Sequence, residues 1–241
     1  IVDGSKYTRR NVMSINYSPR VSVVIPCHNE AGGIMGCITD ARTTCESFNI
    51  SLEIIVVDNA SNDNTAELAR VYGAHVIEEP HLGYGNALRR GFREARGEFI
   101  VFGDGDGSYD FKEIPRFLSL IQEADFVTGE RRFIASDAMP FLHRYVGRPL
   151  FAFIIRHLFG VPVHDSHSGF GMIKREVLIQ LPLTSSGMEF ASEILIIAHR
   201  NKVRIVSTPI HYRSRIGTSK LRTFRDGARH LHFMGKVLAS P

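Results

Sequence analysis

The chain has 241 residues, of which 44% are apolar and 22% charged, and its formal net charge is +4 with neutral histidine. These values are typical of a globular protein, and the length suffices for one large α/β domain. The three cysteines show no CxxC spacing, so neither a disulfide framework nor a zinc site is indicated. No apolar run reaches the roughly 18 residues of a membrane span, because residues 150–163, the nearest candidate, contain Arg156 and His157.

Regular alternation of secondary structure is predicted from Val21 onward. Residues 1–20 are polar with scattered basic side chains, which predicts a flexible arm rather than a signal peptide. After them, strands are predicted over 21–25, 53–57, 75–78 and from 99, and helices over about 31–48, 65–72 and 84–95, with Gly73 and Gly97 as helix C-caps. This order predicts an α/β, Rossmann-like, mostly parallel sheet flanked by helices.

The stretch 97–110 carries the densest chemical signal. Its apolar residues 99–102 predict a buried strand, which is followed directly by Asp104, Asp106 and Asp110. Carboxylates at the end of such a strand lie in the crevice where open α/β sheets bind ligands, and their mutual repulsion favours Mg²⁺ or Mn²⁺ between them. Asp110 has a second interpretation, as the N-cap of a capping box completed by Glu113.

Polar residues also follow the first two predicted strands. Asn29 and Glu30 end the first, and Asp58 begins a similar group after the second. Each group alone is typical of a turn. Together with the Asp104 cluster, however, they give three polar clusters at one edge of the predicted sheet. Neither GxGxxG nor a Walker lysine follows the first strand, so a dinucleotide fold is not indicated.

Four segments in order resemble family 2 glycosyltransferases of GT-A fold, and most closely the dolichol-phosphate mannose synthase and polyprenyl-phosphate glycosyltransferase branch. They are Val-Ser-Val-Val-Ile-Pro-Cys-His-Asn-Glu at 21–30, Ile-Ile-Val-Val-Asp-Asn-Ala-Ser-Asn-Asp-Asn-Thr at 54–65, Leu-Gly-Tyr-Gly-Asn-Ala at 82–87 and Asp-Gly-Asp at 104–106. The resemblance implies a GT-A domain over 21–221, a basic tail over 222–241 and a nucleotide-sugar donor.

The resemblance also implies roles on the donor side. It puts Pro26, Asn29, Glu30, Asp58 and Gly83 along the nucleotide, Asp104 near the ribose or sugar, and Asp106 on a metal ion that bridges the diphosphate. Ser108 stands where this branch often has Gln as a further metal ligand. The segment 217–221 resembles a Gly-x-Ser-Lys motif whose Lys220 closes over the diphosphate together with a preceding Arg, either Arg213 or Arg215.

The acceptor side is less regular in sequence. After a predicted strand over 125–128, Arg131 is a candidate for holding an anionic acceptor, as are Arg144 and Arg148 in a following helix, although solvated arginines are an equal alternative there. Asp165, in Asp-x-x-x-Gly-Phe, matches an aspartate that the family places beside the acceptor. Glu189, at the start of a helix over 188–200, is a second acidic candidate or a partner of the helix dipole. His164 and His167 lack a third metal ligand in the sequence and are interpreted as structural.

From Arg200 the chain carries ten Lys or Arg against the single acid Asp226. An apolar helix face is predicted from Phe224, Ala228, Leu231, Val237 and Leu238, which suits a helix in a membrane interface and equally one that packs on its own domain. Stacking aromatic residues do not alternate with the basic ones, so nucleic acid is not an expected partner.

The sequence thus predicts metal-dependent, inverting transfer of a hexose from GDP-mannose or UDP-glucose to a polyprenyl or dolichyl monophosphate, by a peripheral enzyme on the cytoplasmic side of a membrane. Asp104, Asp106, Arg131 and Asp165 are the candidate catalytic residues. The alternatives are transfer to a soluble hydroxyl acceptor and a non-catalytic nucleotide-sugar sensor.

Overall fold

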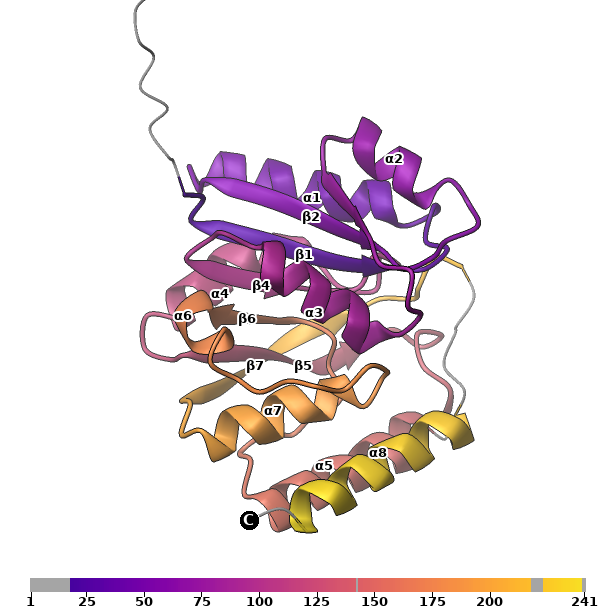
Figure 1. Ribbon diagram of the computed structural model, residues 1–241, viewed down its shortest axis with the longest axis vertical. Helices are drawn as coiled ribbons and strands as arrows, with labels where there is room; N and C mark the ends of the chain where they lie inside the picture. Colours follow the sequence, from indigo (N-terminus) through magenta and orange to yellow (C-terminus); the bar gives the residue numbers. More distant parts are fainter. Residues whose placement is uncertain (1–17, 142, 218–222, 240–241) are drawn as a thin grey trace, which may run out of the picture.

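A seven-stranded sheet with helices on both faces forms the computed structural model, which describes residues 18–141, 143–217 and 223–239 (Figure 1). The strands lie in the order β3 (His75–Glu78), β2 (Leu52–Asp58), β1 (Val21–Cys27), β4 (Phe99–Phe102), β6 (Gly171–Lys174), β5 (Phe126–Ile134) and β7 (Ile205–Tyr212). Only β6, among these strands, runs antiparallel to its neighbours. The predicted α/β class with a mostly parallel sheet is confirmed.

Strand β1 shows why the sheet is buried on both faces. Its Val21, Val23 and Ile25 pack in one cluster, while Val24 packs in the other, as the two-residue period of a strand requires. The first cluster lies under α1 (Ile34–Ser47), α2 (Thr65–Val71), η1 (Phe111–Glu113) and α4 (Ile114–Leu120). The second lies under α3 (Tyr84–Glu94), α5 (Arg148–Phe159), α6 (Arg175–Leu178), α7 (Phe190–Arg200) and α8 (Thr223–Ala239). A π-helical turn, η2 (His143–Gly147), precedes α5.

The predicted elements up to β4 are all present, with ends shifted by at most three residues. Two caps differ from their predictions. Helix α3 ends at Glu94 with Ala95 as its C-cap, so Gly97 is not a cap; a Cβ there would lie 2.5 Å from the Ser22 nitrogen. Asp110 does cap η1 by accepting from the Lys112 N–H, but Glu113 pairs with Arg116 instead of closing a capping box.

Strands β6 and β7 were not predicted. Strand β7 pairs with β5 at the edge of the sheet, so the first part of the basic stretch that begins at Arg200 belongs to the domain itself. Strand β5 continues to Ile134, beyond the predicted 128, with an irregularity between Arg131 and Phe133. Because of this extension, Arg131 lies on the side of the sheet where the parallel strands end and where Asp104 and Asp106 follow β4.

Helices α5 and α8 lie side by side below the sheet in the orientation of Figure 1, and the rings of Phe151 and His230 are 5.6 Å apart. The face of α8 that packs on the domain includes His230, Met234 and Val237, whereas Leu231 and Leu238 are exposed. The residues predicted to form one apolar face therefore do not share a face, because Val237 packs on the domain while Leu231 and Leu238 are exposed. In the described part of the chain, none of the helices has the length and apolar character needed to cross a membrane.

Candidate active site

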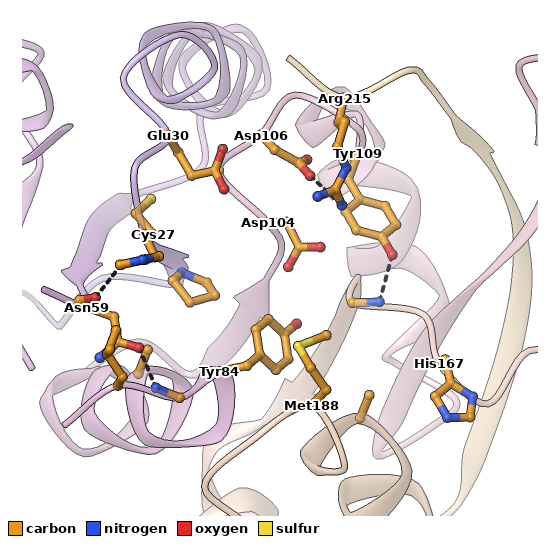
Figure 2. Close-up of a pocket in the computed structure, with 18 of the residues that line it drawn as sticks. Cys27, Glu30, Asn59, Tyr84, Asp104, Asp106, Tyr109, His167, Met188 and Arg215 are labelled. Atoms are coloured by element: carbon orange, nitrogen blue, oxygen red, sulfur yellow. Dashed lines mark hydrogen bonds and ion pairs between the residues drawn. The ribbon is translucent and has the colours of Figure 1, made fainter. Parts of the chain in front are cut away.

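A cavity of about 290 Å³ opens at the carboxyl ends of β1, β2 and β4 (Figure 2). Its wall combines charged and polar side chains with aromatic and small ones. The described residues that line it are Pro26, Cys27, His28, Glu30, Asn59, Leu82, Gly83, Tyr84, Ala87, Asp104, Gly105, Asp106, Tyr109, Arg131, His167, Gly169, Met188, Ala191, Tyr212 and Arg215. The strand-end crevice predicted from the Asp cluster therefore exists.

Three carboxylates, from Glu30, Asp104 and Asp106, point into the acidic end of the cavity (Figure 2). Among the described residues, none supplies a hydrogen-bond partner for the buried Oδ1 atom of Asp104. Burial, and then the charge of Asp106, raises the pKa of Asp104 to about 7. A cation bound at this end would restore the charged form of Asp104 and satisfy its unpaired oxygen.

Asp106 is held by two contacts. Its Oδ1 accepts from the Ser108 N–H at 2.9 Å, and its Oδ2 lies 3.0 Å from Arg215 Nη2. Ser108 itself is fully buried and is not among the lining residues, so its hydroxyl does not reach the cavity as a predicted metal ligand would. Its main chain orients Asp106 instead.

Asp104 and Asp106 fit a divalent cation whose remaining ligands come from the substrate and from water. Among the described residues, no group of three or more His, Cys, Asp or Glu side chains is arranged as a metal cage. Mg²⁺ is commonly bound through one or two carboxylates together with substrate phosphates and water, rather than by such a cage. The unpartnered Asp104 Oδ1 and the neighbouring Asp106 carboxylate provide that number of protein ligands.

The predicted nucleotide residues divide into two groups. Pro26, Glu30 and Gly83 line the cavity. Asn29 and Asp58 do not: Asn29 accepts from the Asn62 N–H at 2.7 Å and so holds the turn together, while Asp58 is buried and its Oδ1 has no partner within the described part of the chain. Asn59 lines the cavity in their place, and its Oδ1 accepts from the Gly83 N–H at 2.7 Å.

Gly83 and Gly85 allow the start of α3 to lie against the loop before α7. Gly83 has a φ of 147°, and a Cβ there would lie 2.1 Å from the Ser186 carbonyl oxygen. A Cβ on Gly85 would lie 2.3 Å from that of Ser185. The Gly-Tyr-Gly sequence is thus a steric requirement for closing this wall of the cavity.

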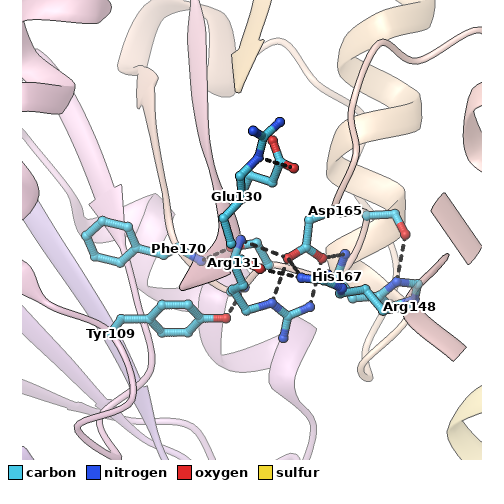
Figure 3. A network of polar contacts seen from close by, with 11 residues as sticks. Tyr109, Glu130, Arg131, Arg148, Asp165, His167 and Phe170 are labelled. Carbon is cyan, nitrogen blue, oxygen red and sulfur yellow. Dashed lines mark hydrogen bonds and ion pairs between the residues drawn. The ribbon is translucent and has the colours of Figure 1, made fainter. Parts of the chain in front are cut away.

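A buried ion pair contributes Arg131 to the cavity wall (Figure 3). Nε and Nη2 of Arg131 donate to the two carboxylate oxygens of Asp165 at 2.7 and 2.8 Å. Burial alone would raise the pKa of Asp165, but the charge and hydrogen bonds of Arg131 lower it to about 2. Arg148 lies 4.0 Å from the same carboxylate and donates to the Arg131 carbonyl oxygen. Arg131 lines the cavity and Asp165 lies behind it.

Three other predicted residues, Arg213, Arg144 and Glu189, do not line this cavity. Arg213 pairs with Asp110 and, with Arg144, lines a second cavity, so of the two arginines proposed for the donor diphosphate, Arg215 is the one on the cavity wall. Glu189 is not a lining residue, because its Oε1 accepts from Arg229 at 3.0 Å and joins α7 to α8. Lys220 lies outside the described residues.

Several lining residues were missed in the sequence. Tyr84 stands between the two glycines at 83 and 85, and Tyr109 follows the Asp cluster; both rings lie on the cavity wall. His167 also lines the cavity, and its Nε2 is 3.2 Å from His230 Nδ1, which connects the site to α8. Only position next to a motif could have indicated these residues, because none carries a pattern of its own.

In sequence, the chain is similar to proteins named as hexosyltransferases. The chain is 39% identical over 221 residues to the low-salt glycan biosynthesis hexosyltransferase Agl6 of Haloferax volcanii, which covers 90% of this chain but only 53% of that protein. It is 33% identical over 209 residues to a dolichyl-phosphate hexose transferase of the same organism, covering 86% and 89% of the two chains.

In fold, the chain resembles glucosyl-3-phosphoglycerate synthase from Mycobacterium tuberculosis, crystallised with Mn²⁺, UDP and phosphoglyceric acid. The TM-score is 0.71 at 23% identity, with 92% of this chain and 78% of the other covered. The model of glycosyl transferase family 2 matches residues 22–181, well over half of the chain. The chain therefore belongs to glycosyl transferase family 2.

Proposed function

We propose that this chain transfers a hexosyl group, with inversion, from a nucleotide-diphosphate sugar to a polyprenyl or dolichyl monophosphate at a membrane surface. One observation carries the proposal: a single cavity is lined both by the Asp104 and Asp106 carboxylates and by the Arg131 guanidinium. The carboxylates suit a metal-bound donor diphosphate, and the guanidinium suits an anionic acceptor.

On the donor side, Asp104 and Asp106 would hold Mg²⁺ or Mn²⁺. When bound, the metal ion offsets the negative charge that develops on the leaving diphosphate. The structural neighbour crystallised with Mn²⁺ and UDP supports this use of the fold. Glu30, Asn59 and Gly83 line the part of the cavity in which the nucleoside would lie.

On the acceptor side, Arg131 and Arg148 together carry one more positive charge than Asp165 neutralises. A phosphate monoester with a second pKa near 6 is largely ionised at neutral pH, so its oxygen attacks without a strong general base. That oxygen forms a bond to the anomeric carbon while the bond to the donor diphosphate breaks on the opposite face, which inverts the configuration. Asp165 then serves to orient Arg131, and no proton transfer is required of it.

The surface of η2, α5 and α8 supports action at a membrane. Large apolar side chains are exposed on these elements and just before η2: Phe141, Tyr145, Val146, Leu150, Phe153, Leu158, Leu231 and Leu238. Arg144, Arg156 and Lys236 lie on the same elements. Apolar side chains beside basic ones are typical of helices that lie in a bilayer interface, and each Lys or Arg near an anionic leaflet adds about 1 kcal/mol. The relative named as a dolichyl-phosphate hexose transferase agrees with a lipid acceptor.

A soluble acceptor is the second candidate. The structural neighbour whose title names phosphoglyceric acid has the same fold, and that acid also presents negative charge to its enzyme. The two candidates are separated by incubating the protein with UDP- and GDP-sugars, Mg²⁺ or Mn²⁺, and either a short polyprenyl phosphate or phosphoglyceric acid. Sugar on the lipid supports the proposal, and sugar on the soluble acid alone rejects it. A protein that binds donor but never releases nucleoside diphosphate would be a sensor.

A further inference from the structure

Arg215 occupies the position in which the acidic end of the cavity needs positive charge. We propose that Arg215 is a placeholder for the divalent cation: it must leave Asp106 before a metal ion binds there, and the donor diphosphate draws it away. The inference rests on the proposed metal-dependent function and adds to it a coupling between the two ligands. Metal ion and nucleotide diphosphate would then each strengthen the binding of the other.

Main-chain hydrogen bonds on both sides of Arg215 hold its segment against the loop that carries Asp106. The Ile216 N–H donates to the Asp106 carbonyl oxygen at 2.8 Å, and the Arg213 N–H donates to that of Ser108 at 2.9 Å. The Ile216 side chain lies against Gly32, where an added Cβ would come within 2.9 Å of it. The segment that carries Arg215 is therefore seated on the loop that carries Asp106 (Figure 2).

The charges around Arg215 explain why it takes this position. Asp106 pairs with it, Asp104 lies close enough to interact with its charge, and its side chain is only 23% exposed. Of the two arginines that the described residues contribute to the lining, Arg131 is already paired with Asp165. Arg215 thus supplies positive charge to Asp104 and Asp106.

Both oxygens of Asp106 are engaged, one by the Ser108 N–H and the other by Arg215. A metal ion arriving alone must break the charge-assisted contact to Arg215 and leave that guanidinium half-buried beside a second cation. A diphosphate that arrives with the metal ion gives the guanidinium a new anionic partner. The metal ion alone should consequently bind weakly, and the two ligands together strongly.

The experiment measures Mn²⁺ binding without any sugar or acceptor, by electron paramagnetic resonance of the free ion, in the wild-type protein, Arg215→Gln and Arg213→Gln. Each titration is repeated with saturating UDP and with saturating GDP. Arg213→Gln is the matched control. Arg213 carries the same charge two residues before Arg215, but its side chain pairs with Asp110 outside the cavity. Arg215→Lys keeps the charge but loses the planar fork. Thermal melts check the fold of every variant.

We expect Arg215→Gln to bind Mn²⁺ alone about tenfold more tightly than the wild-type protein, as removal of one competing charge-assisted contact predicts. Its coupling to UDP or GDP should fall by a similar factor, while Arg213→Gln stays within about twofold of wild type and Arg215→Lys lies between. Equal Mn²⁺ affinity in Arg215→Gln and wild type, or an equal gain in Arg213→Gln, overturns the inference and leaves the proposed function standing. No Mn²⁺ binding by any of these proteins, even with nucleotide, rejects the proposed metal dependence and the inference with it.

Discussion

Arg131 and Asp165 form one unit: two side-chain hydrogen bonds of 2.7 and 2.8 Å and a third, of 3.1 Å, from the Arg131 N–H join them, and both are buried (Figure 3). Replacing Asp165 therefore also releases Arg131 from its fixed position. Loss of activity in an Asp165 variant does not by itself identify Asp165 as a base, so the stability, pH dependence and kinetic parameters that it changes have to be compared.

The first prediction concerns stability. Removing either partner, in Arg131→Met or Asp165→Leu, leaves an uncompensated buried charge and should cost about 3–5 kcal/mol of unfolding free energy. The double variant should cost clearly less than the sum of the two, because no buried charge remains. Urea denaturation of the four proteins gives the coupling energy, and additive losses would show that the pair is not coupled.

The second prediction concerns the stability of the protein at low pH. The folded pKa of Asp165, about 2, lies below the unfolded value near 3.9, so its contribution to stability is present above pH 4 and is lost as pH falls through 2. The difference in unfolding free energy between wild type and Asp165→Asn should therefore shrink by about 2–3 kcal/mol between pH 5 and pH 2. Denaturation at several pH values measures it. A constant difference would place the pKa of Asp165 at its ordinary value.

The third prediction separates orientation from base catalysis. In Asp165→Asn, Arg131 keeps its charge but loses the carboxylate that fixes its geometry, so KM for the lipid phosphate should rise more than kcat falls. Steady-state kinetics with a short polyprenyl phosphate distinguishes the two parameters. A large fall in kcat with unchanged KM would assign Asp165 a proton-transfer role and favour a hydroxyl acceptor.

The fourth prediction concerns the metal ion. Asp106→Ala removes a carboxylate at the acidic end of the cavity and should abolish both sugar transfer and Mn²⁺-dependent binding of UDP or GDP. Isothermal titration with and without Mn²⁺ measures the binding. Wild-type activity that persists in excess chelator would contradict metal dependence.

The fifth prediction concerns the membrane surface. Phe153 and Leu231 are 59% and 56% exposed on α5 and α8, and Phe153→Glu or Leu231→Glu should lower binding to anionic liposomes several-fold with little change in thermal stability. Val71→Glu is the control, because Val71 is 74% exposed on α2, which is not part of the η2, α5 and α8 surface. Equal losses in all three variants would argue against a specific membrane-facing surface.

The sequence was informative where one local pattern determines one element. Buried runs such as 99–102 and the alternation of strands and helices predicted the sheet as far as β4, and the carboxylates after β4 predicted the crevice. It failed at β6, whose four residues Gly-Met-Ile-Lys give too short a pattern, and at β7, whose Pro209 and basic surroundings resemble a polar tail. Pro209 is tolerated because β7 lies at the sheet edge.

The same limit applies to the site residues. The difference between Arg213 and Arg215 depends on how the chain turns after β7, where the strand period no longer applies. The pairing of Arg131 with Asp165 joins residues 34 positions apart in sequence, a contact that only the fold creates. Ser108 follows the Asp cluster directly, yet its side chain faces the interior.

The central claim is transfer of sugar to a lipid phosphate, and its most direct measurement follows labelled hexose from UDP-glucose or GDP-mannose into the organic phase with a short polyprenyl phosphate and Mg²⁺ or Mn²⁺. The account predicts a lipid-linked product whose anomeric configuration is opposite to that of the donor, formed by the wild-type protein and not by Asp106→Ala. Label found only on a soluble hydroxyl acceptor, or a lipid product with retained configuration, would contradict it.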